Sequence, residues 1–206
     1  MSDSFFADLG IPRPDHHLEV GSGSHAVQTA EVMKRFEPVL ESVQPRAILV
    51  VGDVNSTLAC ALVAAKRGVR VIHVEAGLRS YDRGMPEEIN RVLTDQISDL
   101  LFITEKSALA NLVREGIDPA RVEFVGNVMI DTLYRNLEHA VPASRTLGTK
   151  LPQYAVLTLH RPSNVDDPAT LAGLLDTIGE INRSLPVVMP LHPRTRGNIE
   201  KFGLTA

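Results

Sequence analysis

The feature that most constrains the fold is a pair of short apolar runs, each of which ends in an acidic residue. The first covers residues 47–53 (Ala-Ile-Leu-Val-Val-Gly-Asp) and the second covers residues 69–75 (Val-Arg-Val-Ile-His-Val-Glu). A β-branched run followed by a helical pattern predicts a buried strand of a parallel sheet. Ligands of open α/β sheets bind beyond the carboxyl ends of the strands, so we expect Asp53 and Glu75 to lie at a functional site.

Strand and helix patterns alternate along the chain, which predicts an α/β fold with parallel sheets and right-handed crossovers. Apolar residues at helical spacing predict a first helix over residues 26–43, which Pro38 is expected to kink or split. Ser56 or Thr57 is expected to cap the second helix. The expected strands are 47–51, 69–75, 99–103, 121–125, 154–159 and 186–190, and the later helices are about 56–67, 86–98, 106–115, 128–138 and 167–183.

The periodicity fades over residues 141–153, where we predict a linker between two domains. The predicted domains are residues 1–142, a Rossmann-like domain, and residues 143–206, the beginning of a second one. A chain of 206 residues is long enough for one large domain or for one domain and part of another.

Composition narrows the possible functions. The net charge of −4 and an aromatic content of 4% without Trp argue against nucleic-acid binding. The only cysteine, Cys60, excludes an internal disulfide and a cysteine-built zinc site, and suits a reducing cytoplasm. The first residues lack the basic and apolar regions of a signal peptide, and no apolar stretch is long enough to span a bilayer. We therefore expect a cytoplasmic protein that binds neither nucleic acid nor membrane.

The two acidic residues at the strand ends each have a structural alternative. Asp53 can act as a base or hold a substrate hydroxyl, but aspartate is also common in turns and at helix N-caps. Glutamate is disfavoured in strands, and a buried glutamate needs partners or a raised pKa, as is common at active sites. The alternative for Glu75 is an ion pair with Arg79. We favour the functional interpretation for Glu75.

A third acidic cluster begins a helix. Pro86 suits the first helical position, and Glu87 and Glu88 lie in the first turn, where the helix dipole favours anions. For one of the two glutamates, we expect that this interaction with the helix dipole, and not a catalytic role, explains its presence. Asn90 and Arg91, in the next turn, could hold the preceding loop by hydrogen bonds.

The histidines and the first glycine-rich segment are less specific. His73 and Glu75 form a His-x-Glu pair, but a zinc deaminase would need cysteines downstream, so His73 is expected to be a core histidine. His160-Arg161 suits binding or protonation of a diphosphate, with a structural histidine as the alternative, which we prefer for His192. Residues 21–26 do not follow a strand, so they predict a flexible loop near a ligand and not a dinucleotide site.

Several segments together are similar to one enzyme family. They are Gly21-Ser-Gly-Ser-His25, Gly52-Asp53 with Asn55-Ser56-Thr57, His73-Val-Glu-Ala-Gly-Leu-Arg79, Met85-Pro-Glu-Glu-Ile-Asn-Arg91, Gly126-Asn127 through Ile130-Asp131, and Leu159-His160-Arg161. In this order they resemble the non-hydrolysing UDP-N-acetylglucosamine 2-epimerases. The most specific part is the combination of the segments that begin at His73 and at Met85.

The resemblance implies a two-domain fold of the glycosyltransferase-B type with the active site in the cleft between the domains. It implies reversible conversion of UDP-GlcNAc to UDP-ManNAc through loss of UDP, a 2-acetamidoglucal intermediate and re-addition of UDP. It makes Asp53, Glu75, Glu87 and His160 the catalytic candidates. It also implies substrate-binding roles, which we assign to Arg79, Asn90 and Arg161, no cofactor and no metal, and a homodimer in the full-length form.

The chain departs from the family pattern in three ways. It lacks the opening strand and the Gly-Thr-Arg-Pro-Glu loop, it lacks the C-terminal part with the diphosphate loop, and Ser163 stands where the family usually has glutamate. We therefore expect a fragment that is itself inactive. The alternatives are a truncated protein that folds poorly or associates through exposed strand edges, and a glycosyltransferase on the same scaffold.

Overall fold

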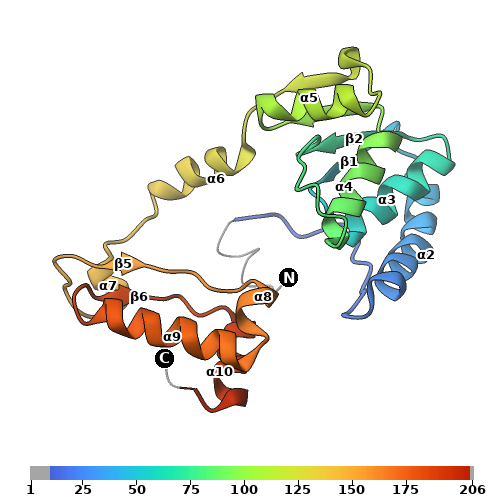
Figure 1. Ribbon diagram of the computed structural model, residues 1–206. Coiled ribbons are helices and arrows are strands. Elements are labelled where there is room, and N and C mark those ends of the chain that lie inside the picture. Colours follow the sequence, from blue (N-terminus) through green and yellow to red (C-terminus); the bar gives the residue numbers. More distant parts are fainter. Residues whose placement is uncertain (1–9, 205–206) are drawn as a thin grey trace. The chain divides into compact units, whose positions relative to one another are not determined.

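The computed structural model describes residues 10–204 (Figure 1). The chain forms two compact units, Met1–His139 and Ala140–Ala206, each of which is described by itself. Both units combine helices with parallel strands, which confirms the α/β class predicted from the sequence. Among the described residues, no helix is both long and apolar enough to cross a membrane.

The first unit is built on a four-stranded parallel sheet in the order β1-β2-β3-β4. Its strands are β1 (Ala47–Val51), β2 (Arg70–Val74), β3 (Leu100–Ile103) and β4 (Val122–Phe124). Its helices are α2 (His25–Val43), α3 (Asn55–Lys66), α4 (Pro86–Ile97), α5 (Lys106–Arg114) and α6 (Val128–Leu137), with a short 3-10 helix at Pro119–Arg121. Each of these strands and α-helices begins and ends within one residue of its predicted bounds.

The helices cover one face of this sheet. Val50 on β1 is in register with His73 on β2, which is in register with Leu101 on β3, so the three side chains share that face. Two apolar clusters lie there: Leu40, Val50, Ala61, Val63, Ala64 and Val71 form the first, and Ala76, Leu101, Ile103, Ala108, Leu112 and Ile117 form the second. Leu49 and Val51 point to the opposite face and are 57% and 48% exposed.

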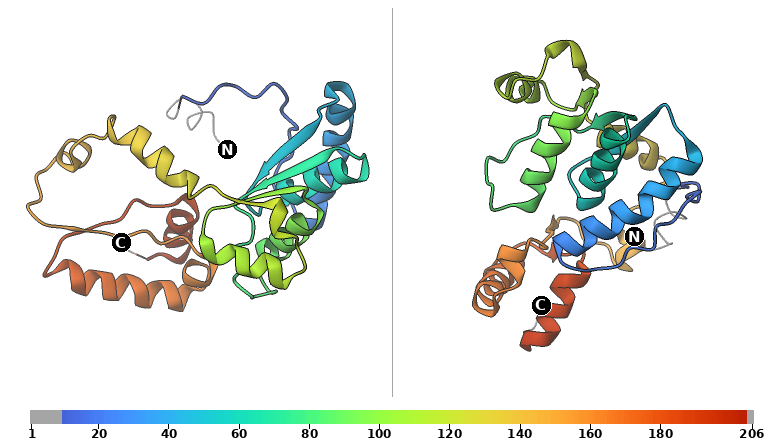
Figure 2. Two further views of the ribbon diagram at one scale, coloured as in Figure 1. Left: turned by 90° about the horizontal axis from the view of Figure 1, so that it is seen from above. Right: turned by 90° about the vertical axis from the view of Figure 1, so that its right-hand side faces the viewer.

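The structure contradicts a split of α2 at Pro38 and a cap on α3 by Ser56 or Thr57. Helix α2, which packs along α3 (Figure 2), continues through Pro38 to Val43. Helix α3 begins at Asn55 after Val54, without a side-chain cap, so neither Ser56 nor Thr57 caps it. The Thr57 hydroxyl instead donates to the carbonyl of Val51 at 2.8 Å and so fixes the helix to the end of β1.

The second unit has shorter strands than predicted. β5 (Ala155–Val156) and β6 (Val187–Val188) pair only with each other, so their ladder ends after two residues instead of covering 154–159 and 186–190. The unit also contains α7 (Ala143–Leu147) within the predicted linker, α8 (Pro162–Val165), α9 (Pro168–Asn182) and α10 (Pro193–Phe202). Its core consists of Val165, Leu171, Leu175 and Ile199.

Candidate active site

The ends of β1 and β2 lie side by side, and Asp53 and Glu75 follow them. Gly52 follows β1 with φ of +70° and donates its N–H to the carbonyl of Val74 at 3.0 Å. Glu75 comes after β2, not within it as predicted, and has φ of +69°. A left-handed conformation at a non-glycine residue is strained, and such strain is concentrated at functional sites. The Glu75 Oε2 lies 3.4 Å from where a Cβ on Gly52 would be.

Helix α4 holds the turn that carries Asp53. Arg91 forms an ion pair with the Asp53 carboxylate, whose side chain is 31% exposed. The Asn90 amide donates to the Asp53 carbonyl at 2.9 Å and to Asn55 Oδ1 at 3.2 Å. Asp53 is therefore neither a helix cap nor a free turn residue, because both its backbone and its side chain are bound by α4.

Glu88 ties the preceding loop to the same helix. It is 3% exposed and accepts hydrogen bonds from the Ser80 and Tyr81 N–H groups at 3.0 and 2.9 Å, from the Ser80 hydroxyl, and from Arg91 at 2.6 Å. Burial by itself raises the pKa of Glu88, but these hydrogen bonds bring that pKa below its usual value. Arg91 thus holds the loop through Glu88, as the sequence led us to expect, while Asn90 holds the Asp53 turn.

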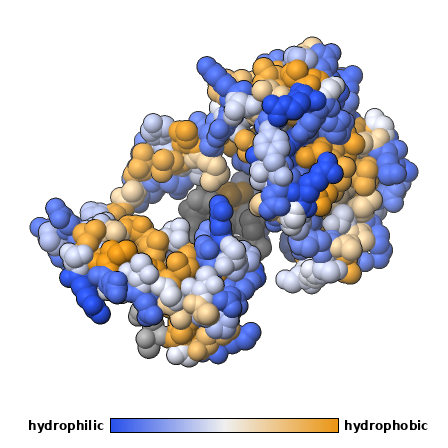
Figure 3. Space-filling model, in the orientation of Figure 1, coloured by the Kyte–Doolittle hydropathy of each residue, from blue (hydrophilic) through white to orange (hydrophobic). Residues whose placement is uncertain are grey.

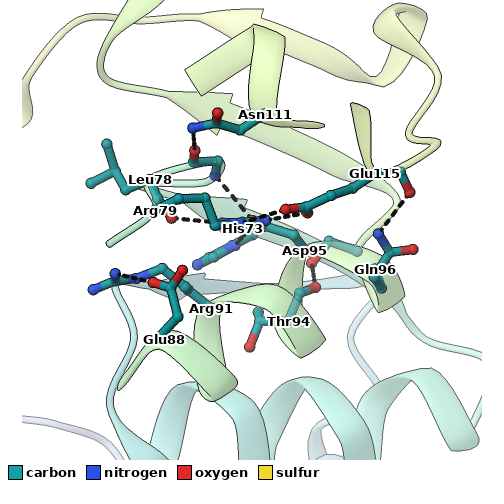
Figure 4. A network of polar contacts seen from close by, with 12 residues as sticks. His73, Leu78, Arg79, Glu88, Arg91, Thr94, Asp95, Gln96, Asn111 and Glu115 are labelled. Atoms are coloured by element: carbon teal, nitrogen blue, oxygen red, sulfur yellow. Dashed lines mark hydrogen bonds and ion pairs between the residues drawn. The ribbon is translucent and has the colours of Figure 1, made fainter. Parts of the chain in front are cut away.

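A second, buried network lies beneath the site (Figure 4). His73 and Asp95, both fully buried, are joined by a contact of 2.7 Å between Nδ1 and Oδ1. The other ring nitrogen, Nε2, lies 2.9 Å from the Gly52 carbonyl. The other Asp95 oxygen accepts from the Gly77 N–H at 3.1 Å and from Arg79 at 2.7 Å. His73 is a core histidine, as expected, but it contacts the turn next to Asp53.

Arg79 belongs to this network. Its side chain is 1% exposed and is paired with Asp95 and Glu115, so the suggested ion pair with Glu75 is wrong. Burial alone lowers the pKa of Arg79, but hydrogen bonds to Glu115 and Asp95 raise it above its usual value. A guanidinium enclosed in this way supports the loop more directly than it could bind a substrate.

The sequence reasoning overlooked Asp95. It lies on α4 seven residues after Glu88 and four after Arg91, so the three share one side of the helix. The sequence did contain a signal for this network. Glu88, Arg91 and Asp95 are charged, yet they recur at the helical spacing that normally places apolar residues in the core.

Two carboxylates remain without partners. Within the described part of the chain, no hydrogen bond or ion pair involves the side chain of Glu75 or that of Glu87, and both residues are partly buried. Glu87 precedes Glu88 in the first turn of α4, and Glu75 lies against Gly52. Because neither carboxylate is held by a described partner, both are candidates for proton exchange with a ligand.

The Gly-Ser segment is connected to the same turn. Ser24 caps α2 by accepting from the Val27 N–H, and His25 begins the helix. The Nδ1 of His25 lies 3.1 Å from the amide nitrogen of Asn55, and that nitrogen also donates to Gln28 at 2.7 Å. These contacts place the beginning of α2 beside the residues that follow Asp53; the predicted contact of the segment with a ligand stays a prediction.

The second unit carries His160 and Arg161 in the segment between β5 and α8, and both are exposed. The His160 ring lies 5.6 Å, centre to centre, from the ring of His192. His192 accepts from the Arg194 N–H and caps α10, which fits the structural role preferred for it. Ser163, in α8, is also exposed.

Comparison with known proteins identifies relatives over the whole length of the chain. The family model for UDP-N-acetylglucosamine 2-epimerase matches residues 1–204. A UDP-2,3-diacetamido-2,3-dideoxy-D-glucuronate 2-epimerase from Pseudomonas aeruginosa is 46% identical over 99% of this chain and 58% of that protein. A UDP-N-acetylglucosamine 2-epimerase from Methanococcus maripaludis is 42% identical, with the same shares covered.

Solved structures agree with the sequence relatives. The crystal structure of Methanocaldococcus jannaschii UDP-GlcNAc 2-epimerase in complex with UDP-GlcNAc and UDP superposes with a TM-score of 0.87 at 42% identity, over 98% of this chain and 57% of that one. The chain thus spans less than two thirds of the length of the relatives it matches. The predicted architecture of the glycosyltransferase-B type is confirmed by these neighbours.

Proposed function

Because this chain belongs to the UDP-N-acetylglucosamine 2-epimerase family, we propose that the protein containing it interconverts UDP-GlcNAc and UDP-ManNAc. The observation that carries the proposal is that neither Glu75 nor Glu87 has a hydrogen-bond or ion-pair partner among the described residues. Glu75 lies against Gly52, beside the turn that holds Asp53, and Glu87 lies in the first turn of α4. Epimerisation at C2 needs groups that remove a proton from one face of the sugar and return one to the other.

In the proposed reaction, a carboxylate takes the C2 proton while the C1–O bond breaks and its electron pair leaves with UDP. The product of this step is 2-acetamidoglucal. UDP then adds back at C1 as a proton reaches the opposite face of C2, so atoms and charge balance without any redox step or cofactor. Glu75, Glu87 and Asp53 are the proposed proton carriers, and Glu75 is the first of them to test.

Binding of the diphosphate is proposed for His160 and Arg161, whose exposed side chains can donate charge-assisted hydrogen bonds to phosphate oxygens. Arg79 and Asn90 are proposed to act on substrate only indirectly. The first is enclosed by Asp95 and Glu115, and the second donates its amide to Asp53 and Asn55. The proposed enzyme is cytoplasmic, since the single cysteine suits a reducing compartment. We also propose that the full-length enzyme is a homodimer.

The test is an interconversion assay on this chain extended at both ends to the length of its relatives. UDP-GlcNAc should yield UDP-ManNAc, detected by the anomeric proton signals, and the reverse reaction should reach the same mixture. UDP-2,3-diacetamido-2,3-dideoxy-D-glucuronate is assayed in parallel because the P. aeruginosa relative is named for that substrate. No C2 epimerisation of either sugar would rule the proposal out. The 206-residue chain alone should be inactive.

A second candidate, an association module, is favoured by the exposed Leu49 and Val51 on the open face of the sheet. Parallel sheets are normally covered on both faces, so this face is suited to contact with further protein. A glycosyltransferase on the same scaffold would instead transfer sugar to an acceptor and leave C2 unchanged. The interconversion assay distinguishes that activity from epimerisation.

A further inference from the structure

We infer that His73 and Asp95 are positioning residues, which together hold the Gly52–Asp53 turn and the segment after Glu75 in a fixed relation. The imidazole of His73 contacts Gly52 at the end of β1, and the carboxylate of Asp95 contacts Gly77 after β2. The two side chains also contact each other (Figure 4). The inference rests on the proposed function for its catalytic consequence, but its geometry can be tested without catalysis.

On the β1 side, the restraint acts through Gly52. Its carbonyl accepts from His73 Nε2 at 2.9 Å, and its N–H donates to Val74 at 3.0 Å. Both groups belong to β2, so the residue just before Asp53 is fixed from the neighbouring strand. Loss of the His73 contact would leave the Asp53 turn held by α4, through Asn90 and Arg91, and by the hydrogen bond from Gly52 to Val74.

On the β2 side, the restraint acts through Gly77. Its N–H donates to Asp95 at 3.1 Å, and its carbonyl accepts from Asn111 at 2.9 Å. The Ala76 N–H donates to Phe102 at 3.1 Å. The residues after Glu75 are therefore bound to α4, α5 and β3, which maintains the left-handed backbone at Glu75 itself.

The contacts of His73 use both ring nitrogens. A backbone carbonyl only accepts hydrogen bonds, so Nε2 carries a proton for its contact with Gly52. Nδ1 shares the second hydrogen bond with Asp95 at 2.7 Å, while the other Asp95 oxygen accepts from Gly77 and Arg79. Each polar atom of the His73–Asp95 pair therefore has a partner.

The first test is a nitrogen-15 NMR spectrum of the ring of His73 in the 206-residue chain at neutral pH. We expect Nε2 to show a directly bonded proton. A ring whose Nε2 is unprotonated would overturn the inference, because the contact with the Gly52 carbonyl could then not be donated by His73. The signals are assigned by comparison with His73→Gln.

The second test is Asp95→Asn in the same chain. Asparagine offers one oxygen and cannot accept from His73, Gly77 and Arg79 together, so the amide signals of Gly52, Asp53 and Gly77 should all shift. The matched control is Glu115→Gln, which alters the Arg79 end of the network and should leave Gly52 and Asp53 unchanged. Unshifted Gly52 and Asp53 signals in Asp95→Asn would contradict a positioning role.

The catalytic consequence is measured in the extended protein. Asp95→Asn should lower kcat on the order of 100-fold with little change in KM, as expected when reacting groups are misplaced. Val71→Ala, which removes core volume at a side chain that takes no part in the hydrogen bonds of the network, should lower stability while retaining kcat. An Asp95→Asn enzyme with unchanged kcat would refute positioning. An inactive wild type would refute the proposed function, while the NMR result would still decide the network.

Discussion

At the level of single residues, the acidic side chains near the strand ends divide by what they contact. Asp53 and Glu88 are paired with Arg91, and Asp95 is paired with His73 and Arg79. Glu75 and Glu87 have no such partner within the described residues. The buried Glu88 and Asp95 hold the backbone of the site, which leaves Glu75, Glu87 and the partly exposed Asp53 as the candidates for proton transfer.

Glu88 gives a pH-dependent prediction. Because its pKa is lowered by folding, its contribution to stability is present above its unfolded pKa, about 4.5, and is lost as the pH falls through the lower folded value. Glu88→Gln should therefore reduce the free energy of unfolding by about 1.5–3 kcal/mol at pH 7. The difference from wild type should shrink below about pH 4.5.

Urea unfolding between pH 3 and 7 measures this dependence. The matched control is Glu87→Gln, one residue earlier in the same turn and without these hydrogen bonds, which should change stability by less than about 0.5 kcal/mol. Equal losses in the two variants, or a Glu88→Gln loss that does not decrease as the pH falls from 7 to 3, would show that the hydrogen-bonded carboxylate is not the cause.

The residues of the site could be predicted only in part. Gly52, Asp53 and Glu75 followed from apolar runs that end at acidic residues, because the position of a strand end depends on local sequence. The pairing of Arg79 with Asp95 and Glu115 could not be predicted, since these residues are 16 and 36 positions away from it in the sequence. Tertiary packing decides which carboxylates are paired, and the local patterns of a single sequence do not indicate contacts between residues that are distant in the chain.

At the level of elements, the contact between the segment after β2 and helix α5 depends on a glycine. Gly77 has φ of +76°, and a Cβ there would lie 2.8 Å from the Ala108 carbonyl oxygen and 2.9 Å from its Cβ. Gly68 has φ of +71°, but nothing lies within 4 Å of its Cβ position. The two glycines thus share a left-handed backbone and differ in crowding.

We predict that Gly68→Ala costs about 1–2 kcal/mol, the usual penalty of a left-handed L-residue. Gly77→Ala should cost clearly more, because α5 must also move away from β2. Urea unfolding of the two variants makes the comparison, and equal losses would contradict the close packing at Gly77.

The elements of the first unit were predicted well because strong 2.0- and 3.6-residue periodicities alternate there. The second unit was predicted less well. Its strands β5 and β6 have only one neighbour each, so pairing ends before the apolar runs do. Helices α8 and α10, which both begin at a proline, are not among the helices predicted from the sequence.

At the level of the whole molecule, a large amount of apolar surface is exposed on the first unit. Besides Leu49 and Val51, helix α6 exposes half or more of each of Met129, Ile130, Leu133, Tyr134 and Leu137, and part of this surface can be followed in Figure 3. Contiguous exposed apolar surface on a protein indicates a contact with further protein. The relatives are longer than this chain, which gives such a contact a natural source.

We therefore predict that the 206-residue chain self-associates with rising concentration. Size-exclusion chromatography with light scattering measures this, and Leu49→Lys should weaken the association because a charge on the open sheet face opposes it. The control is Glu37→Lys, which places the same charge at an exposed position on α2 and should have little effect on the association. A monodisperse monomer with one sharp unfolding transition would contradict the prediction.

The central claim is that Glu75 moves a proton at C2 of a UDP-sugar. The most direct measurement incubates the extended protein with UDP-GlcNAc in D₂O and follows deuterium at C2 by mass spectrometry and proton NMR. We predict deuterium in the recovered UDP-sugars, and a rate lower by about 2–4 orders of magnitude in Glu75→Gln, the contribution of a general acid or base. The exposed Glu37→Gln should exchange at the wild-type rate. Wild-type exchange in Glu75→Gln, or no exchange in the unaltered protein, would contradict the account.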